Sequence, residues 1–97
     1  MSLRGEPVER EVALPGGRAI LVRVAVAADP YIARRELGTV ALELVADGRV
    51  EATVNTLLTP TQVREARNLA DEVADRLASG ELQPTAAAIE PLADSIR

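Results

Sequence analysis

The spacing of the hydrophobic residues changes along the chain, and this change constrains the fold more than any other feature. In the first half, apolar residues alternate with polar ones, as they do in half-buried β-strands. From Pro60 to Ser79 they instead recur every three or four residues, which is typical of an amphipathic helix. Strands followed by a helix predict an α+β fold. The 97 residues suffice for one domain, 1–97, in which we expect residues 1–6 to be flexible or partly cloning-derived.

Four segments of the first half are predicted to form an antiparallel meander sheet. Val8 to Leu14 alternates loosely, and Arg10 on its apolar side favours a position at the edge of the sheet. Ala19 to Ala28 is largely apolar on both sides, which favours a central position. Thr39 to Val45 and Arg49 to Leu57 are expected to pair as a hairpin.

The register of this hairpin is predicted from its hydrophobic pattern. A two-residue loop at Asp47-Gly48 would mix apolar and polar side chains on each face. A three-residue loop, Ala46 to Gly48, pairs Leu44 with Val50 and makes one face wholly apolar. We therefore predict a type I turn with a glycine bulge at Gly48.

A long helix is predicted to cover the apolar face of the sheet. Thr59 is its expected N-cap, Pro60 its first residue, and Gln62 the third residue of a capping box. Gly80 supplies the C-terminal stop. The apolar stripe consists of Val63, Ala66, Ala70, Val73 and Leu77.

A short C-terminal helix is expected to start at Pro84. Pro91 either ends it near Glu90 or kinks it. A segment of this size would add little to its own core, so we expect it to dock on another subunit. The side chains expected at that interface are Ile89, Leu92 and Ile96.

Composition excludes several kinds of function. The chain has no His and no Cys, which removes the commonest general base, the thiolate nucleophile and thiolate-type zinc sites. All 11 basic residues are Arg, against 15 acidic ones, and the net charge of -4 argues against nucleic acid or an anionic membrane as partner. No apolar run approaches the roughly 20 residues of a membrane span. We therefore expect a cytoplasmic protein without a cofactor or enzymatic activity, and the preference for Ala and Arg indicates a GC-rich, bacterial genome.

Two groups of residues are candidate sites. In the predicted register Glu43 lies opposite Glu51, and two adjacent carboxylates can share a proton or hold Ca²⁺ or Mg²⁺. The alternative is that a neighbouring Arg18 or Arg23 neutralises them, and no metal site is expected.

The second candidate group is Arg34 and Arg35 beside Tyr31, in a segment that resembles a short helix or a structured crossover. Guanidinium groups bind carboxylates and phosphates in a bidentate manner and stack on aromatic rings. The alternative is a solvated charged surface.

Two functions remain after these exclusions. The apolar residues of the long helix, the central strand and the C-terminal segment exceed what one small core requires, which favours a homo-oligomer. The first function is therefore a small acidic interaction module, homodimeric, that binds a protein partner through its sheet or oligomeric surface. The alternative is a domain that binds or senses an anionic metabolite through Tyr31, Arg34 and Arg35.

Overall fold

The computed structural model describes residues 7–26, 40–56, 58–59 and 61–95. The elements in this part of the chain are β1 (Val8–Ala13), β2 (Ala19–Val26), β3 (Val40–Ala46), β4 (Arg49–Asn55), α1 (Val63–Ser79) and α2 (Ala86–Ser95). The strands form one antiparallel sheet in the order β1-β2-β3-β4. The predicted α+β meander with a long helix and a short C-terminal helix is confirmed.

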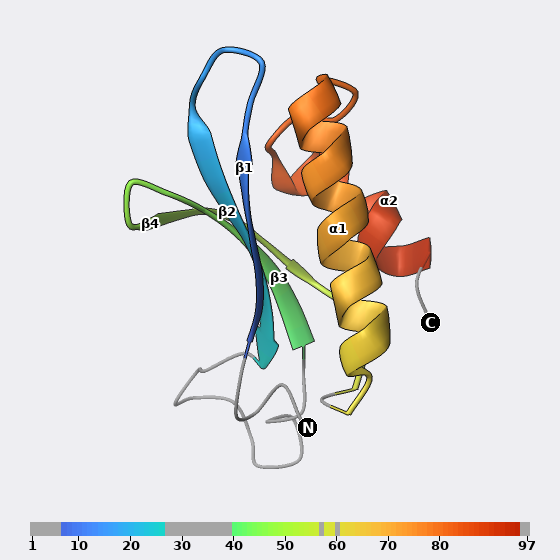
Figure 1. The fold of residues 1–97 in the computed structure, drawn as a ribbon. Coiled ribbons are helices and arrows are strands. Elements are labelled where there is room, and N and C mark those ends of the chain that lie inside the picture. The colour runs from blue at the N-terminus through green and yellow to red at the C-terminus, as the bar shows by residue number, and fades with distance from the viewer. Residues whose placement is uncertain (1–6, 27–39, 57, 60, 96–97) are drawn as a thin grey trace.

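Both helices lie on the same side of the sheet (Figure 1). The long helix α1 packs over β1 and β2, and α2 packs beside it against β4. The molecule therefore has two layers, and no described helix or strand packs on the opposite face of the sheet. None of the helices in the described part of the chain has the length and apolarity that a membrane span requires.

The hydrophobic core fills the space between the sheet and the two helices. Each large side chain that is completely buried there stabilises the fold by roughly 1.5–3 kcal/mol relative to an exposed one. The largest of these side chains are Ile20, Val22 and Val24 of β2, Val40, Leu42 and Leu44 of β3, Leu69, Val73 and Leu77 of α1, and Ile89 of α2.

The position of Arg10 confirms that β1 is an edge strand. Arg10 pairs across the sheet with Val22, which places it on the side that faces the helices. Its Nε donates to Asp71 Oδ1 of α1 at 2.6 Å, and its Nη1 donates to the backbone carbonyl of Glu9 at 2.8 Å. The guanidinium thus reaches water at the edge, ties β1 to α1 and occupies a carbonyl of the strand.

The β3–β4 hairpin corrects the predicted loop. The turn has two residues, Asp47 and Gly48, with φ angles of 53° and 77°. Two successive positive φ angles define a type I′ turn, whose twist matches that of the strands it joins. The predicted three-residue loop with a glycine bulge is therefore wrong.

A β-bulge in β4 explains why the pattern was misleading. Val45 pairs with Val50 and Leu44 pairs with Ala52, so Glu51 is an extra residue without a partner on β3. The bulge restores the alternation that a two-residue loop alone would disturb. Leu44 and Ala52 still face the helices, but Val50, predicted to share their face, lies on the other one.

The helix α1 begins at Val63 and not at Pro60, which lies outside the described residues. A turn precedes it, in which the Gln62 backbone N–H donates to the Thr59 carbonyl at 3.1 Å. Half of the predicted capping box is present, because Gln62 Oε1 accepts a hydrogen bond from the Thr59 N–H at 2.8 Å. The predicted end is confirmed: Gly80 has a φ of 82° and donates its N–H to the Leu77 carbonyl.

The helix α2 is capped by Thr85, whose Oγ1 accepts a hydrogen bond from the Ala88 N–H at 3.3 Å. It continues through Pro91 to Ser95, so the alternative in which it ends near Glu90 is wrong. Ile89 and Ala93 are completely buried in the core. The expectation that this segment adds little to the core of its own chain is also wrong.

Candidate interaction surface

The face of the sheet opposite the helices carries exposed apolar side chains beside a row of charged ones. We call it the uncovered face. Residues that pair across antiparallel strands point to the same side, so the register gives the composition of this face row by row. The charged row consists, from β1 to β4, of Glu9, Arg23, Glu43 and Thr53. The apolar row next to it consists of Glu11, Leu21, Val45 and Val50.

The apolar row forms a hydrophobic strip over β2, β3 and β4. Leu21 and Val45 are half-buried, and neither belongs to the core cluster between sheet and helices. Among the large hydrophobic residues of the described part of the chain, Val50 is the exposed one, with 54% of its surface accessible. The bulge beside Glu51 puts Val50 in this row. Contiguous apolar side chains on a surface are typical of sites that bind another protein.

The charged row contains a cation that is incompletely paired. Arg23 pairs across the strands with Glu9 on one side and Glu43 on the other. Its Nε lies 3.9 Å from Glu9 Oε2, which is too far for a hydrogen bond. This Nε is buried and has no hydrogen-bond partner among the described residues. A buried donor without a partner is costly. The rest of the guanidinium is accessible, because the Arg23 side chain is 43% exposed, and a carboxylate could approach it there.

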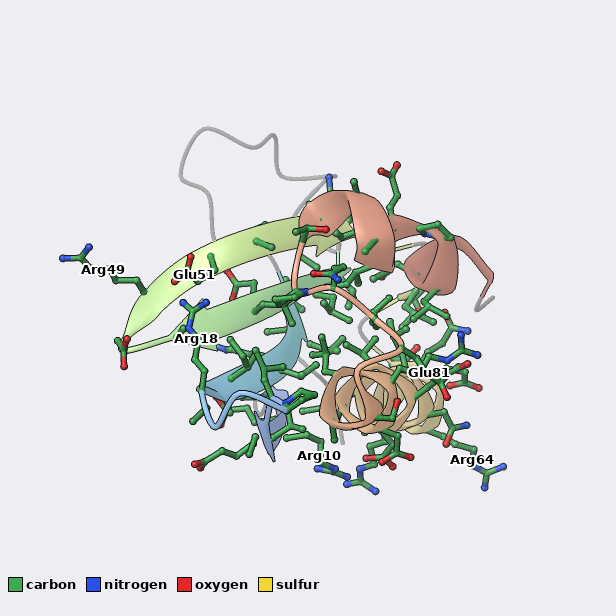
Figure 2. The ribbon with its side chains drawn as sticks, turned by 90° about the horizontal axis from the view of Figure 1, so that it is seen from above. Arg10, Arg18, Arg49, Glu51, Arg64 and Glu81 are labelled. Carbon is green, nitrogen blue, oxygen red and sulfur yellow. The ribbon has the colours of Figure 1, made fainter. Side chains whose placement is uncertain are left out.

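An ion pair links the start of β2 to β4 at the end of the sheet near the turns. Arg18, just before β2, donates through Nη2 to Glu51 Oε1 at 2.5 Å. Figure 2 shows these two side chains directed toward one another at the end of the sheet that is remote from the helices, while Arg49 extends away from them. The alternative in which a neighbouring arginine neutralises the acidic residues is confirmed for Glu51.

The structure separates the two carboxylates that were predicted to lie opposite one another. Glu43 pairs with Thr53, and Glu51 is the bulged residue. The predicted apposition of Glu43 and Glu51 is therefore wrong, and its cause is the misplaced loop. Within the described ranges no three residues of the kinds that ligate metals come together.

Both edges of the sheet are protected against pairing with another strand. At β1, Arg10 occupies the Glu9 carbonyl and is held by Asp71. At β4, the bulge at Glu51 interrupts the regular ladder, and the charged Arg49 lies at the start of the strand. Bulges and charged side chains at edges disfavour extension of a sheet. The uncovered face is thus the better candidate for association.

The other predicted site residues lie elsewhere. Tyr31, Arg34 and Arg35 lie outside the described residues, as does Ile96. Ile89 is completely buried and Leu92 is partly buried against the same core. Their predicted contact with a second subunit stays a prediction, but the structure uses both side chains within one chain.

A second surface feature is a depression of about 460 Å³ at the start of α1. The described residues that line it are all contributed by one segment, from Thr61 to Asn68. No second described element contributes a wall. The depression is therefore a weaker candidate for a binding site than the uncovered face.

Sequence reasoning found part of this surface. The apolar character of both sides of Ala19–Val26 indicated a second hydrophobic face, and Leu21 lies on it. Val50 was assigned to the core, because the bulge that reverses its direction leaves no mark in the hydrophobic pattern. Comparison of the chain with models of protein families, with curated proteins and with solved structures finds no match.

Proposed function

We propose that this protein is a small, non-enzymatic interaction module that acts as a homodimer in the cytoplasm and binds a second copy through its uncovered face. The observation that carries this proposal is the apolar row of Leu21, Val45 and Val50 on a face that no described element covers. The absence of His and Cys from the sequence supports a role in binding rather than catalysis.

The charges of the uncovered face favour a second copy over a different partner. A strongly acidic or basic partner would be matched by a face of one sign. Here the two signs alternate along the charged row, in the order Glu9, Arg23 and Glu43. A face with both signs and an apolar strip can complement itself in a two-fold symmetric dimer.

The size of the face sets the expected affinity. With strands about 4.8 Å apart and about 20 Å long, a four-stranded face offers a flat area of about 400 Å². A standard stable interface buries about 800 Å² on each partner. The dimer is therefore expected to be weak, with a dissociation constant of about 10 μM or higher.

Sedimentation equilibrium over a range from about 1 μM to about 1 mM, chosen to span the expected dissociation constant, tests the proposal. We expect the average mass to rise from that of the 10.3 kDa chain toward twice that value. An average mass that stays at that of one chain over the whole range would overturn the proposal. This result would also be obtained if the uncovered face binds a different protein instead of a second copy.

Two matched variants locate the interface. Val50→Glu adds a charge to the apolar row and should weaken the dimer at least about tenfold. Ala87→Glu adds the same charge at an exposed position in the first turn of α2 and should leave the dimer unchanged. If Ala87→Glu weakens the dimer and Val50→Glu does not, the interface lies at α2 and the assignment to the uncovered face is wrong.

A further inference from the structure

We infer that the two-fold axis of this dimer runs parallel to the strands, between β2 and β3, so that Arg23 of each copy pairs with the partner's Glu43. This inference rests on the proposed function and deepens it, because it names which side chains of the two faces meet. It follows from the composition of the rows on the uncovered face.

A two-fold axis in this position has a simple geometric consequence. It lays β2 of one copy over the partner's β3, and each residue lies over the copy of its own cross-strand neighbour. Sandwiched sheets keep their strands within about 30° of one another at a separation of about 10 Å, so this superposition is a normal packing.

The neighbouring residues of β2 and β3 match in chemistry. Leu21 pairs across the strands with Val45, and Arg23 pairs with Glu43. In the dimer, Leu21 therefore lies over the partner's Val45, and Arg23 over the partner's Glu43. By symmetry each contact occurs twice, which gives two apolar contacts and two ion pairs. The outer strands place Glu9 over the partner's Thr53, whose hydroxyl can donate to it. In the other row they place Glu11 over the partner's Val50, at the edge of the interface, where the carboxylate can reach water.

Other axes parallel to the strands bring like charges or mismatched groups together. An axis along β2 would put Arg23 over the partner's Arg23, and an axis along β3 would do the same with Glu43. An axis between β1 and β2 would bury Leu21 against the partner's Glu11. An axis between β3 and β4 would leave Arg23 without a carboxylate.

Two axes perpendicular to the strands are also unfavourable. An axis along the charged row stacks Arg23 on the partner's Arg23, and an axis between the rows stacks charged residues on apolar ones. The position between β2 and β3 lays Arg23 over a carboxylate and Leu21 over an apolar side chain at the same time, and its unfavourable contact, Glu11 over Val50, lies at the edge of the interface.

The state of Arg23 in the single chain supports the same contact. Within the described residues its ion pair is with Glu9, at 3.9 Å, which is longer than a hydrogen bond. The side chain is 43% exposed, so the guanidinium is open to a group that approaches from the uncovered face. The partner's Glu43 would supply the carboxylate that the chain itself does not bring within hydrogen-bonding distance.

Charge reversal with mixing tests this inference. In a homodimer of Arg23→Glu, the glutamate at 23 lies over the partner's Glu43. In a homodimer of Glu43→Arg, the arginine at 43 lies over the partner's Arg23. Each variant alone should therefore dimerise at least about tenfold more weakly than the wild type. In an equimolar mixture, Glu at 23 meets Arg at 43 and the native Glu43 meets the native Arg23. We expect the mixture to form a heterodimer of near wild-type affinity, identified by its mass in native mass spectrometry.

Mixing separates the contact between chains from the contact within one chain. Each variant breaks its own Arg23–Glu43 cross-strand pair, and this damage is the same before and after mixing. General attraction between the variants is excluded as a cause, because the formal charge of -4 becomes -6 in Arg23→Glu and -2 in Glu43→Arg, each reversal changing it by two. Circular dichroism and thermal melting of each variant show whether its fold is retained, and the double variant Arg23→Glu/Glu43→Arg, which restores both contacts, should dimerise like the wild type.

The outcomes distinguish the two proposals. If the wild type dimerises but the mixture of folded variants does not recover, the axis between β2 and β3 is wrong and the proposed function stands. The same holds if the double variant fails to dimerise while it is folded. If the wild type is monomeric at all concentrations, the proposed function itself is wrong.

Discussion

Replacement of Ile89 by alanine tests whether α2 is part of the core of its own chain. Ile89 is completely buried against the sheet, although the sequence placed it at a contact with another subunit. The substitution removes three carbons, worth about 0.8 kcal/mol each, and leaves a cavity that the neighbours fill only in part. We expect the free energy of unfolding to fall by about 3–4 kcal/mol, and the melting temperature by about 12–32 °C.

The measurement is urea unfolding followed by circular dichroism, at a concentration at which light scattering shows a monomer. Leu92→Ala is the matched control, because it removes the same number of carbons from the same helix at a partly buried position. It should cost about half as much. A loss below about 1 kcal/mol for Ile89→Ala in the monomer would show that α2 is not packed as described.

Three smaller changes test local features by the same unfolding assay. Gly48→Ala should lower the free energy of unfolding by about 1–2 kcal/mol, because a φ of 77° disfavours a residue with a side chain. The control Gly16→Ala, at a position with open space, should change it by less than about 0.5 kcal/mol. Equal costs for the two variants would contradict the type I′ turn. Thr85→Ala should cost about 1 kcal/mol through loss of the cap, and Thr85→Ser should retain most of it. A double-mutant cycle on Arg10 and Asp71 should give a coupling below about 1 kcal/mol, since both side chains are about half exposed; a larger value would show a stronger tie between β1 and α1.

The order and placement of the elements could be predicted because local signals agreed with the tertiary structure. Arg10 in a loosely alternating segment marked an edge strand, and its guanidinium lies at that edge. The segment Ala19–Val26, apolar on both sides, is central in the sheet. Gly80 ended the long helix as expected, because the left-handed backbone there favours glycine.

The details of pairing and capping depend on contacts that a hydrophobic pattern does not encode. The three-residue loop was chosen to keep one face apolar, but a bulge at Glu51 achieves this with a two-residue turn. The start of α1 was misplaced because Thr59, the expected cap, makes a hydroxyl contact with Thr61 and takes part in a preceding turn. A capping signal therefore indicated the neighbourhood of the helix start and not its first residue.

The candidate site was predictable only to the extent that the register was. Glu43 and Glu51 were brought together by the wrong loop, whereas Arg18, named as an alternative partner, does bind Glu51. The apolar row was partly visible in Leu21, but Val50 turns to this face only through the bulge. Tyr31, Arg34 and Arg35 lie outside the described residues, so the anionic-ligand site stays a prediction.

The most direct test of the central claim is a dilution series of ¹⁵N-labelled protein followed by NMR. If a second copy binds the uncovered face, the amide shifts that change with concentration will cluster in β2 and β3, around Leu21, Arg23, Glu43 and Val45, and those of α2 will stay constant. Shifts that change instead around Leu92, or that do not change up to about 1 mM, well above the expected dissociation constant, would contradict the account.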